Sequence, residues 1–366
     1  MSKTYDIAII GAGMAGASLA AELAPFASVV VLEAEDTPGY HSTGRSAAFW
    51  EECYGGHQIV PLTLASGEYL RAHDLLHRRG ALYIGRQEDA GQLDAFMARF
   101  GGTGATIERI GASKLREKIP GLRDAWSQAV WEPACADIDV GGLHAHYLKR
   151  ARQAGVNITC NARAVRFERS GNWSIACEDG RAFRASTLVN AAGAWADGVA
   201  RGCGVAPLGI QPYRRTVAQL RCEPAPPRDM PLVLDIGGGF YFKPEGAGVW
   251  LSPHDETPDT AGDVAPHELD IATAIDRFAG VVDWQVERVE RKWAGLRSFA
   301  PDRLPVYGRD AEQPEFFWFA GQGGYGIQTA PAAARLAAQL LLGHSRDEMT
   351  GRLDPALYSP GRFTAR

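Results

Sequence analysis

The sequence lacks several features that would assign a large class of function at once. Its 366 residues carry 38 Lys and Arg against 43 Asp and Glu, a formal net charge of −5, so there is no excess of positive charge. Nucleic-acid-binding domains usually carry such an excess in clusters, so we expect a small-molecule ligand and no nucleic-acid partner. With 46% apolar residues the chain can bury a large core, and its length predicts about two domains.

Cysteine is sparse and follows no metal or disulfide pattern. The six cysteines have no C-x-x-C spacing and lie at Cys53, Cys135, Cys160, Cys177, Cys203 and Cys222. This indicates neither a zinc site nor a disulfide framework, and a reducing, cytoplasmic setting fits best. His73 and His77 lie four apart in a segment that we expect to be helical, but Asp74 stands where an H-E-x-x-H motif needs Glu. No metal site is predicted.

Long hydrophobic runs are also missing. The segment 7–23 carries one charge, Glu22, but it is rich in Gly and Ala, follows Asp6 instead of a basic cluster, and ends near Pro25. It is therefore predicted to be neither a signal peptide nor a membrane span. The apolar run 331–342 is interrupted by Arg335 and Gln339, as in a buried amphipathic helix.

What the sequence does contain begins with "IIGAGMAGAS" at 9–18. Gly11, Gly13 and Gly16 fit G-x-G-x-x-G, in which the first glycine turns the chain, the second admits a pyrophosphate and the third packs helix on strand. "YDIAII" precedes them as a strand, a helix follows, and "SVVVLEAE" predicts a second strand ending in Glu33. An acidic residue 20 positions after Gly13 can bind a ribose. The pattern predicts a dinucleotide site and leaves flavin or nicotinamide open.

Later segments indicate the same kind of domain and then a different one. Residues 140–153 predict a helix with Asp139 as N-cap, and "RASTLVNAAGAWAD" predicts a strand ending in small residues that a cofactor can approach. Residues 206–292 are rich in β-type segments punctuated by proline. The chain then returns with "FFWFAGQGGYGIQTAPAAARLAAQLLLG", which predicts a strand, a Gly-rich turn and a helix.

Four separated stretches resemble the FAD-dependent D-amino-acid oxidase and dehydrogenase family, and in particular its bacterial D-arginine dehydrogenase branch. They are "IIGAGMAGAS", "PGYHSTGRSAA", "VNAAGAWAD", and "WAGLRSFAPDRLPVYG" with "GQGGYGIQT". The resemblance covers nearly the whole chain, and "GYHSTGRSAA" is its most specific part. It implies that the Gly motif holds FAD. No cysteine follows Cys222, so the C-terminal cysteinyl attachment of related sarcosine oxidases is unavailable and non-covalent FAD is expected.

The resemblance implies an α/β fold with two domains. One is a glutathione-reductase-like (Rossmann-type) FAD-binding domain, discontinuous in sequence, for which we expect residues 1–75, 136–205 and 293–366. The other is a substrate domain with a mixed or antiparallel β-sheet, expected at 76–135 and 206–292. A first domain built from separated segments would let the early and the late Gly-rich turns meet.

The predicted cofactor-binding residues gather around these turns. Residues 41–48 are small and hydroxyl-rich, which suits a flat isoalloxazine ring, and the amides of Gly323, Gly324 and Tyr325 could stabilise charge on the reduced flavin. The full predicted set is Gly11, Gly13, Met14, Ala15, Gly16, Glu33, Ala34, His41, Ser42, Thr43, Arg45, Ser46, Ala47, Ala48, Ala164, Val165, Ala191, Gly193, Trp195, Arg297, Gly321, Gly323, Gly324, Tyr325, Gly326, Ile327 and Gln328.

The predicted catalytic residues are Arg215, Tyr241, Arg297, Tyr54 and Gly324. The resemblance places the first three around a substrate carboxylate, which a guanidinium can bind through two parallel hydrogen bonds and a phenol through a third. It also makes Tyr54 part of a lid. Gly55 and Gly56 follow as possible hinges.

These residues predict a flavoenzyme that oxidises a D-amino acid. A hydride leaves the α-carbon, and the imino acid then hydrolyses to a 2-oxo acid and ammonia; no general base stands out. Oxidation of another amino acid or of a 2-hydroxy acid, and a flavin-binding subunit without catalysis, are left open. So is the electron acceptor, oxygen or a quinone or other carrier. A monomer is the working expectation.

The substrate side chain is where the sequence departs from D-arginine dehydrogenase. By local alignment Ala81 stands in place of a glutamate that meets the guanidinium, and Phe49 in place of a histidine. We expect Phe49, Trp50 and Leu82 to line an apolar pocket for a neutral side chain. A basic substrate is the alternative, because Glu51 or Glu52 could turn inward and restore a cation site.

Overall fold

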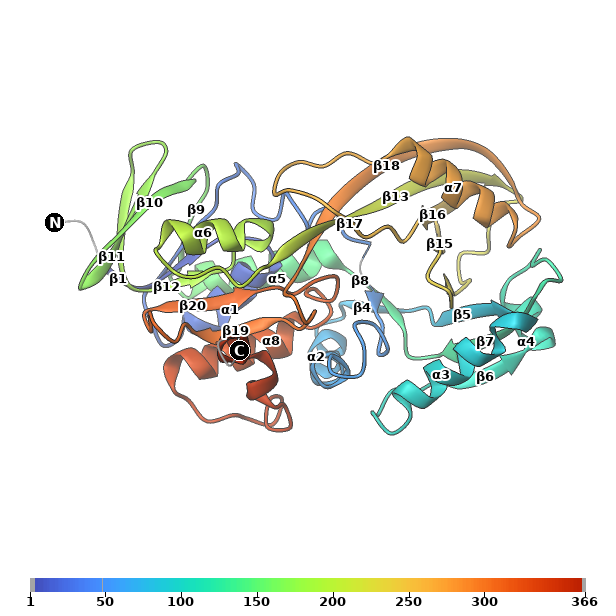
Figure 1. The fold of residues 1–366 in the computed structure, drawn as a ribbon, viewed down its shortest axis with the longest axis horizontal. Helices are drawn as coiled ribbons and strands as arrows, with labels where there is room; N and C mark the ends of the chain where they lie inside the picture. The colour runs from blue at the N-terminus through green and yellow to red at the C-terminus, as the bar shows by residue number, and fades with distance from the viewer. Residues whose placement is uncertain (1–3, 48, 364–366) are drawn as a thin grey trace.

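Two large β-sheets and a small one organise the molecule. The computed structural model describes residues 4–47 and 49–363 (Figure 1). The first large sheet has a parallel part in the order β20-β12-β1-β2-β9. Its strands are β1 (Thr4–Ile10), β2 (Val29–Leu32), β9 (Asn157–Thr159), β12 (Ala182–Asn190) and β20 (Phe316–Ala320). Antiparallel strands extend it: β10 (Ala164–Ser170) and β11 (Asn172–Cys177) beyond β12, and β19 (Val306–Arg309) beyond β20.

Alternation along β1 explains how this sheet buries both faces. Ile7 and Ile9 pack in the core that contains the helices on one side, whereas Ala8 and Ile10 pack on the other with Trp173 of β11. The helices of the first side are α1 (Met14–Leu23), α5 (Val140–Gln153) and α8 (Ala330–Leu342). Helix α6 (Ala196–Gly202) contributes to the second side. The sheet is therefore a three-layer α/β arrangement, seen in the left half of Figure 1.

Helix α5 begins where the sequence predicts. The Asp139 carboxylate accepts a hydrogen bond from the Gly142 amide at 2.8 Å, which satisfies one of the free amides of the first turn. The predicted helix over 140–153 is confirmed, and the amphipathic run 331–342 is confirmed as helix α8.

The second large sheet has the order β17-β13-β16-β15-β14-β5-β7-β6, with β18 paired to β13. Only the pairing of β14 with β5 is parallel, so the sheet is mixed. Its strands are β5 (Ala81–Arg86), β6 (Glu108–Gly111), β7 (Trp126–Glu132), β13 (Gln211–Glu223), β14 (Leu232–Asp235), β15 (Tyr241–Glu245), β16 (Gly248–Ser252), β17 (Thr257–Pro258) and β18 (Gln285–Phe299). The expected α/β fold with a mixed second sheet is confirmed.

Helices cover both faces of this sheet. Helix α3 (Ala90–Phe100) packs with Ala81 and Tyr83, whereas α4 (Ala112–Lys118) and α7 (Glu268–Ala279) pack on the side of Leu82 and Ile84. The predominantly β-type pattern of 206–292 gave no indication of α7. The remaining short helices are η1 (Gln87–Asp89), η2 (Gly193–Trp195), η3 (Pro355–Tyr358) and η4 (Pro360–Phe363).

A small three-stranded sheet is built from segments on either side of β5, β6 and β7 in the sequence. It consists of β3 (Phe49–Trp50), β8 (Ala136–Ile138) and β4 (Leu76–Arg78), and α2 (Val60–Ala72) connects β3 to β4. The expected helix over His73 and His77 is wrong. Helix α2 ends at Ala72, Asp74 takes a left-handed φ of 56°, and His77 lies in β4.

The two large sheets draw on interleaved parts of the chain. The strands of the first sheet fall in three separate parts of the chain, and the long pair β13 and β18 runs from the second sheet towards the first (Figure 1). We expected a domain boundary at 292–293, but strand β18 (Gln285–Phe299) runs through that position while it pairs with β13 of the second sheet. The part of β18 beyond the expected boundary carries Arg297. The division into domains stays a prediction.

Candidate cofactor and substrate site

One cavity lies where the parallel strands of the first sheet end. The strands β1, β2, β12 and β20 all finish at this edge, which is where ligands bind in open parallel sheets. The cavity contains about 1590 Å³ of empty space, part of it open to solvent. Side chains from both large sheets line it, so it can hold a large cofactor at one end and a small molecule at the other.

The glycines of the first turn have distinct positions. Gly11 has a φ of 99°, and a Cβ there would lie 2.7 Å from the Ala191 carbonyl oxygen, so both conformation and space require glycine. Gly13 lines the cavity at the start of α1. A Cβ on Gly16 would lie 1.8 Å from the Gly11 carbonyl oxygen, so Gly16 allows α1 to pack on β1 without itself lining the cavity.

Glu33 follows β2 and is fixed in place by backbone amides. Its carboxylate accepts hydrogen bonds from the amides of Ala12 at 2.7 Å and Glu35 at 3.0 Å, and the residue is 8% exposed. It lines the cavity together with Ala34. The carboxylate is thus fixed beside the cavity, and its binding of a ribose stays a prediction.

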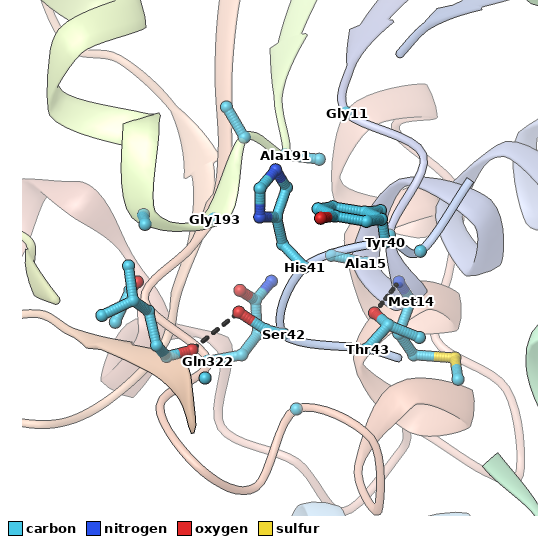
Figure 2. A pocket seen from close by; sticks show the side chains of 18 of the residues that line it. Gly11, Met14, Ala15, Tyr40, His41, Ser42, Thr43, Ala191, Gly193 and Gln322 are labelled. Carbon is cyan, nitrogen blue, oxygen red and sulfur yellow. Dashed lines mark hydrogen bonds between the residues drawn. The ribbon is translucent and has the colours of Figure 1, made fainter. Parts of the chain in front are cut away.

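Residues 39–47 bridge the two large sheets along the cavity (Figure 2). The Thr43 hydroxyl accepts from the Met14 amide at 2.9 Å, and the Ser42 hydroxyl donates to the Leu296 carbonyl of β18 at 2.6 Å. Arg45 donates to Asp263 at 2.7 Å. Figure 2 shows the rings of Tyr40 and His41, which belong to this segment and line the pocket. Ser46 and Ala47 also line the cavity, and Ala48 lies outside the described residues.

The late Gly-rich turn also reaches the cavity, but its amides differ from expectation. Gly323 donates its amide to the Ser298 carbonyl at 2.9 Å, and Tyr325 donates to the Gln322 carbonyl at 3.2 Å. Helix α8 begins only at Ala330. Two of the three amides predicted to face the flavin are therefore already bonded within the chain, and the Gly324 amide is the one that remains for a ligand.

Most of the predicted cofactor-binding residues share this cavity. Those that line it are Gly11, Gly13, Met14, Ala15, Glu33, Ala34, His41, Ser42, Thr43, Arg45, Ser46, Ala47, Ala164, Ala191, Gly193, Trp195, Arg297, Gly323, Gly324, Gly326 and Ile327. Tyr40, Leu296, Ser298 and Gln322 line it too and were not predicted. Their position next to predicted residues could have indicated them: Tyr40 precedes His41, and Leu296 and Ser298 flank Arg297.

Five predicted cofactor residues lie outside the lining for identifiable reasons. Gly16 packs α1, and Gly321 adjoins β20 behind the turn. Val165 is 56% exposed, because alternate residues of β10 face opposite sides and Ala164 takes the cavity side. Tyr325 donates its hydroxyl to the Arg303 carbonyl, and Gln328 holds the Glu51 backbone. Tyr325 and Gln328 therefore hold segments of backbone near the site without lining the cavity.

The predicted carboxylate-binding residues meet at one end of the cavity. Arg215 of β13, Arg297 of β18 and Tyr241 of β15 all line it. Arg215 is 4% exposed and donates through Nη2 to Glu256 at 3.0 Å, but its Nε and Nη1 have no partner in the described chain. Burial and the nearby Arg297 lower its pKa, yet a guanidinium stays charged. Two unpaired buried donors therefore point to an anionic ligand.

Tyr54 and Gly324 complete this end. Arg297 donates through Nη1 to the Tyr54 hydroxyl at 2.7 Å. A Cβ on Gly324 would lie 1.9 Å from that hydroxyl and 3.0 Å from Arg297 Nη1, so only glycine permits the contact. Tyr54 does not line the cavity itself, and Gly55 and Gly56 follow it with φ values of 88° and 90°.

Sequence reasoning missed His254, which supports Tyr241 from behind. The two rings pack edge to face at 5.6 Å, and His254 takes a left-handed φ of 58°, which is uncommon for a residue with a side chain. Burial and the charges of Arg215 and Arg297 lower the pKa of His254 to about 3, so the imidazole is neutral at physiological pH. No local sequence pattern marks a histidine in this role.

Comparison with known proteins decides the family. The model of the family described as FAD dependent oxidoreductase matches residues 6–340. The chain belongs to this family. A glycine oxidase of Geobacillus kaustophilus is 24% identical over 359 residues, covering 93% of this chain and 94% of its own. FAD-dependent oxidoreductase domain-containing protein 1 of Xenopus laevis is 24% identical over 394 residues, covering 92% of this chain and 79% of its own.

Solved structures share the fold of this FAD-dependent oxidoreductase. An L-proline dehydrogenase from P. horikoshii superposes with a TM-score of 0.86 at 21% identity, covering 100% of this chain and 99% of that one. An L-amino acid deaminase from Proteus vulgaris gives a TM-score of 0.81 at 17% identity, covering 99% of this chain and 98% of that one. At these identities the likeness concerns the architecture.

The cavity of this FAD-dependent oxidoreductase fits FAD. Gly13 and Gly324 line it without a side chain, backbone amides fix the Glu33 carboxylate beside it, and the positive end of α1 faces it. No cysteine lines the cavity within residues 4–47 and 49–363. In that same part of the chain no group of three or more His, Cys, Asp or Glu could hold a metal, and no helix is long and apolar enough to cross a membrane.

Proposed function

We propose that this oxidoreductase oxidises the α-carbon of a D-amino acid to an imino acid, which water then converts to a 2-oxo acid and ammonia. The observation that carries the proposal is Arg215, with two unpaired buried nitrogens beside Arg297 at the end of the cofactor cavity. A carboxylate satisfies these donors in the planar, two-pronged geometry that a guanidinium prefers. Glycine oxidase, L-proline dehydrogenase and L-amino acid deaminase are the names of similar proteins, and all three name amino-acid substrates.

Each residue of the clamp has a separate task in this proposal. Arg215 and Arg297 bind the carboxylate, and the Tyr241 hydroxyl adds a hydrogen bond at the cavity wall. Gly324 has no side chain, and this leaves room for the Tyr54 hydroxyl to contact Arg297. FAD, when bound, supplies the acceptor for the hydride that leaves the α-carbon. Fixing the carboxylate at two points orients the α-hydrogen, and positioning of this kind lowers the barrier without a general base.

The side-chain prediction changes in part. Trp50 donates its indole N–H to the Thr63 carbonyl at 3.0 Å in the core with α2, and Leu82 faces the core with α7. Neither lines the cavity, because each side chain packs in a hydrophobic core away from Tyr241. Phe49 and Ala81 pack in the cluster that contains Tyr241, but neither lines the cavity, so Phe49 reaches the site only through Tyr241. We propose a neutral D-amino acid on this ground, with a basic one as the alternative; the likeness to D-arginine dehydrogenase remains a prediction.

An anaerobic reduction experiment tests the function. The purified holoenzyme is mixed without oxygen with D-amino acids, L-amino acids and 2-hydroxy acids, and loss of the flavin absorbance at its long-wavelength maximum is followed. We expect bleaching by one or more D-amino acids with release of ammonia. Bleaching by 2-hydroxy acids alone would establish the rival activity, and no bleaching by any class would indicate a subunit without catalysis. Admitting oxygen or a quinone afterwards identifies the acceptor.

A further inference from the structure

Glu256 is hydrogen-bonded directly to the guanidinium of Arg215. Its Oε1 accepts from Arg215 Nη2 at 3.0 Å, and Arg215 lines the cavity from β13. The other two nitrogens of this guanidinium, Nε and Nη1, have no partner in the part of the chain that the structure describes. Glu256 therefore holds the guanidinium by one nitrogen and leaves the other two for a ligand.

The Glu256 carboxylate is itself held in place by Arg303. Arg303 Nη2 donates to both carboxylate oxygens, to Oε1 at 3.0 Å and to Oε2 at 2.8 Å. The Arg303 guanidinium lies 3.9 Å from the centre of the Phe299 ring, and the Arg303 carbonyl accepts from the Tyr325 hydroxyl. Oε1 is thus shared by two arginines. A charged acceptor that is fixed in this way can set the direction of Arg215.

The segment that carries Glu256 is also attached to the strand that carries Arg215. Asp255 accepts from the amide of Thr216 at 2.7 Å and from its hydroxyl at 2.9 Å. Thr216 follows Arg215 directly on β13. Glu256 therefore keeps a defined place beside β13, although it belongs to a different part of the chain.

Arg215 needs such a partner because Arg297 projects beside it. The register of β13 and β18 pairs Arg215 with Gly295, two residues before Arg297, so both arginine side chains leave the same face of the sheet. Burial and the positive charge of Arg297 lower the pKa of Arg215. Like charges at neighbouring cross-strand positions repel each other. Without Glu256, Arg215 would turn away from the place where both arginines can bind one carboxylate.

We propose that Glu256 is a positioning residue, which directs Nε and Nη1 of Arg215 at the substrate carboxylate. The inference rests on the proposed function, in which Arg215 and Arg297 bind that carboxylate. Neutralisation of positive charge is the rival role for Glu256, and the two roles differ in sign. A group that only neutralises the arginines weakens anion binding, so its loss should tighten binding. A group that positions Arg215 strengthens binding, and a single accepting oxygen is enough for it.

The test compares Glu256→Gln with Glu256→Leu in the FAD-loaded protein. Both variants lose the negative charge, but the glutamine amide keeps an oxygen in the place of Oε1, which accepts from Arg215 and Arg303. The probe is propanoate, a carboxylate without an amine, and its Kd is measured by calorimetry and by the perturbation of the flavin spectrum. Glu290 is the matched control, because it accepts from Arg221 on the same strand at 3.0 Å and neither residue lines the cavity.

We expect Glu256→Leu to bind propanoate about tenfold or more weakly than Glu256→Gln, because a misdirected guanidinium loses its contact with the carboxylate. The same two substitutions at Glu290 should not differ. In an Arg215→Ala background the difference between the Glu256 variants should vanish, since no guanidinium is left to position. Equal Kd values in the two Glu256 variants, or a tenfold difference that persists without Arg215, would overturn the inference.

The outcomes for this inference and for the proposed function can be told apart. Propanoate binding needs no turnover, so the comparison remains informative even when no amino acid reduces the flavin. A wild type that does not bind propanoate would count against both, whereas a wild type that binds it and variants with equal Kd values would count against the inference alone. Should Glu256→Leu not retain FAD, Glu256→Ala removes the same accepting oxygen and should show the same loss relative to Glu256→Gln.

Discussion

At Gly11 a single hydrogen in place of a side chain decides whether the cofactor turn can form. Gly11→Ala introduces a Cβ 2.7 Å from the Ala191 oxygen at a φ of 99°, so strand β12 must shift away from the turn. Gly180→Ala is the control, because Gly180 has a φ of 86° but open space around it. We expect Gly11→Ala to be purified with little FAD and Gly180→Ala to keep a full complement, measured as flavin per protein. Equal FAD content in both would show that the close approach to β12 is unimportant.

The buried guanidinium of Arg215 is a second test at this scale. Arg215→Ala removes a charge-assisted contact of about 1.5–3 kcal/mol to the carboxylate, so kcat/KM on the best amino acid should fall at least tenfold while FAD stays bound. Arg297→Ala should behave alike. The control is Arg221→Ala on the same strand, where the arginine is half-buried and paired with Glu290 at 3.0 Å away from the cavity. If Arg215→Ala keeps the wild-type kcat/KM, Arg215 does not bind the substrate carboxylate.

The segment that carries Tyr54 depends on an element far away in sequence. Gln328, just before α8, holds Glu51 on both backbone groups and also donates to the Thr63 hydroxyl at 2.8 Å. Gln328→Leu leaves these buried groups unpaired, at about 1–3 kcal/mol each, and releases Tyr54 from Arg297. We expect a lower Tm and a KM raised more than kcat is lowered.

A buried glutamine within α8 itself, Gln339, serves as control. Gln339 accepts from the Thr350 hydroxyl at 2.6 Å in α8, remote from the cavity lining. Gln339→Leu should lower Tm without changing KM. If both variants raise KM alike, the effect belongs to the stability of α8 and not to the position of Tyr54.

Elements with a strong local pattern could be predicted from the sequence. Strand β1, helix α1 and strand β2 follow the glycine spacing, and Asp139 marks the start of α5. Helix α7 could not be separated from the β-type segments around it, although Ile271, Ala274 and Phe278 have helical spacing. The prediction that Trp50 and Leu82 line the substrate pocket was wrong for another reason. Their direction depends on which face of each strand meets the core, and register is set by partners elsewhere in the chain.

Contacts across the whole molecule could not be read from local pattern at all. Asp263 pairs with Arg45 across 218 residues, and Glu256 pairs with Arg215 from a loop with no motif. The burial of Glu51 likewise needs Tyr83, Glu132 and Gln328 to come together from three elements. Family resemblance supplied most of the cavity lining, whereas these supports follow only from the folded chain.

Two buried carboxyl groups make the stability of the molecule fall towards alkaline pH. Burial raises the pKa of Glu51 from 4.5 to about 7, and burial together with the charge of Glu51 holds the pKa of Glu132 well above its usual value. Above pH 4.5 the unfolded chain releases these protons while the folded chain keeps them, so rising pH favours unfolding. His144, His146 and His254 have lowered pKa values and are neutral above pH 6.5. The carboxyl groups therefore dominate this local balance from pH 6.5 to 8.

Thermal unfolding at several pH values checks this sign. The wild-type Tm should fall from pH 6.5 to 8, and Glu132→Gln should flatten the fall, because it removes one titrating group and the repulsion that raises the pKa of the other. One pKa unit corresponds to about 1.4 kcal/mol, so the difference is measurable. A Tm that rises over this range, or an equal slope in the variant, would contradict the raised pKa values of these two buried carboxyl groups.

The first sheet takes its strands from distant parts of the chain, and this sets the order of events during synthesis. Ribosomes add about 5–20 residues per second, so β1 and α1 leave the ribosome long before β20, which pairs with β12, and α8, which covers α1. Until then one edge of β12 and an apolar face of α1 lack these partners, and such exposed surfaces make a nascent chain prone to aggregation. Flavin capture is thus a late step in the life of the nascent polypeptide, after the turn at 323–327 has emerged.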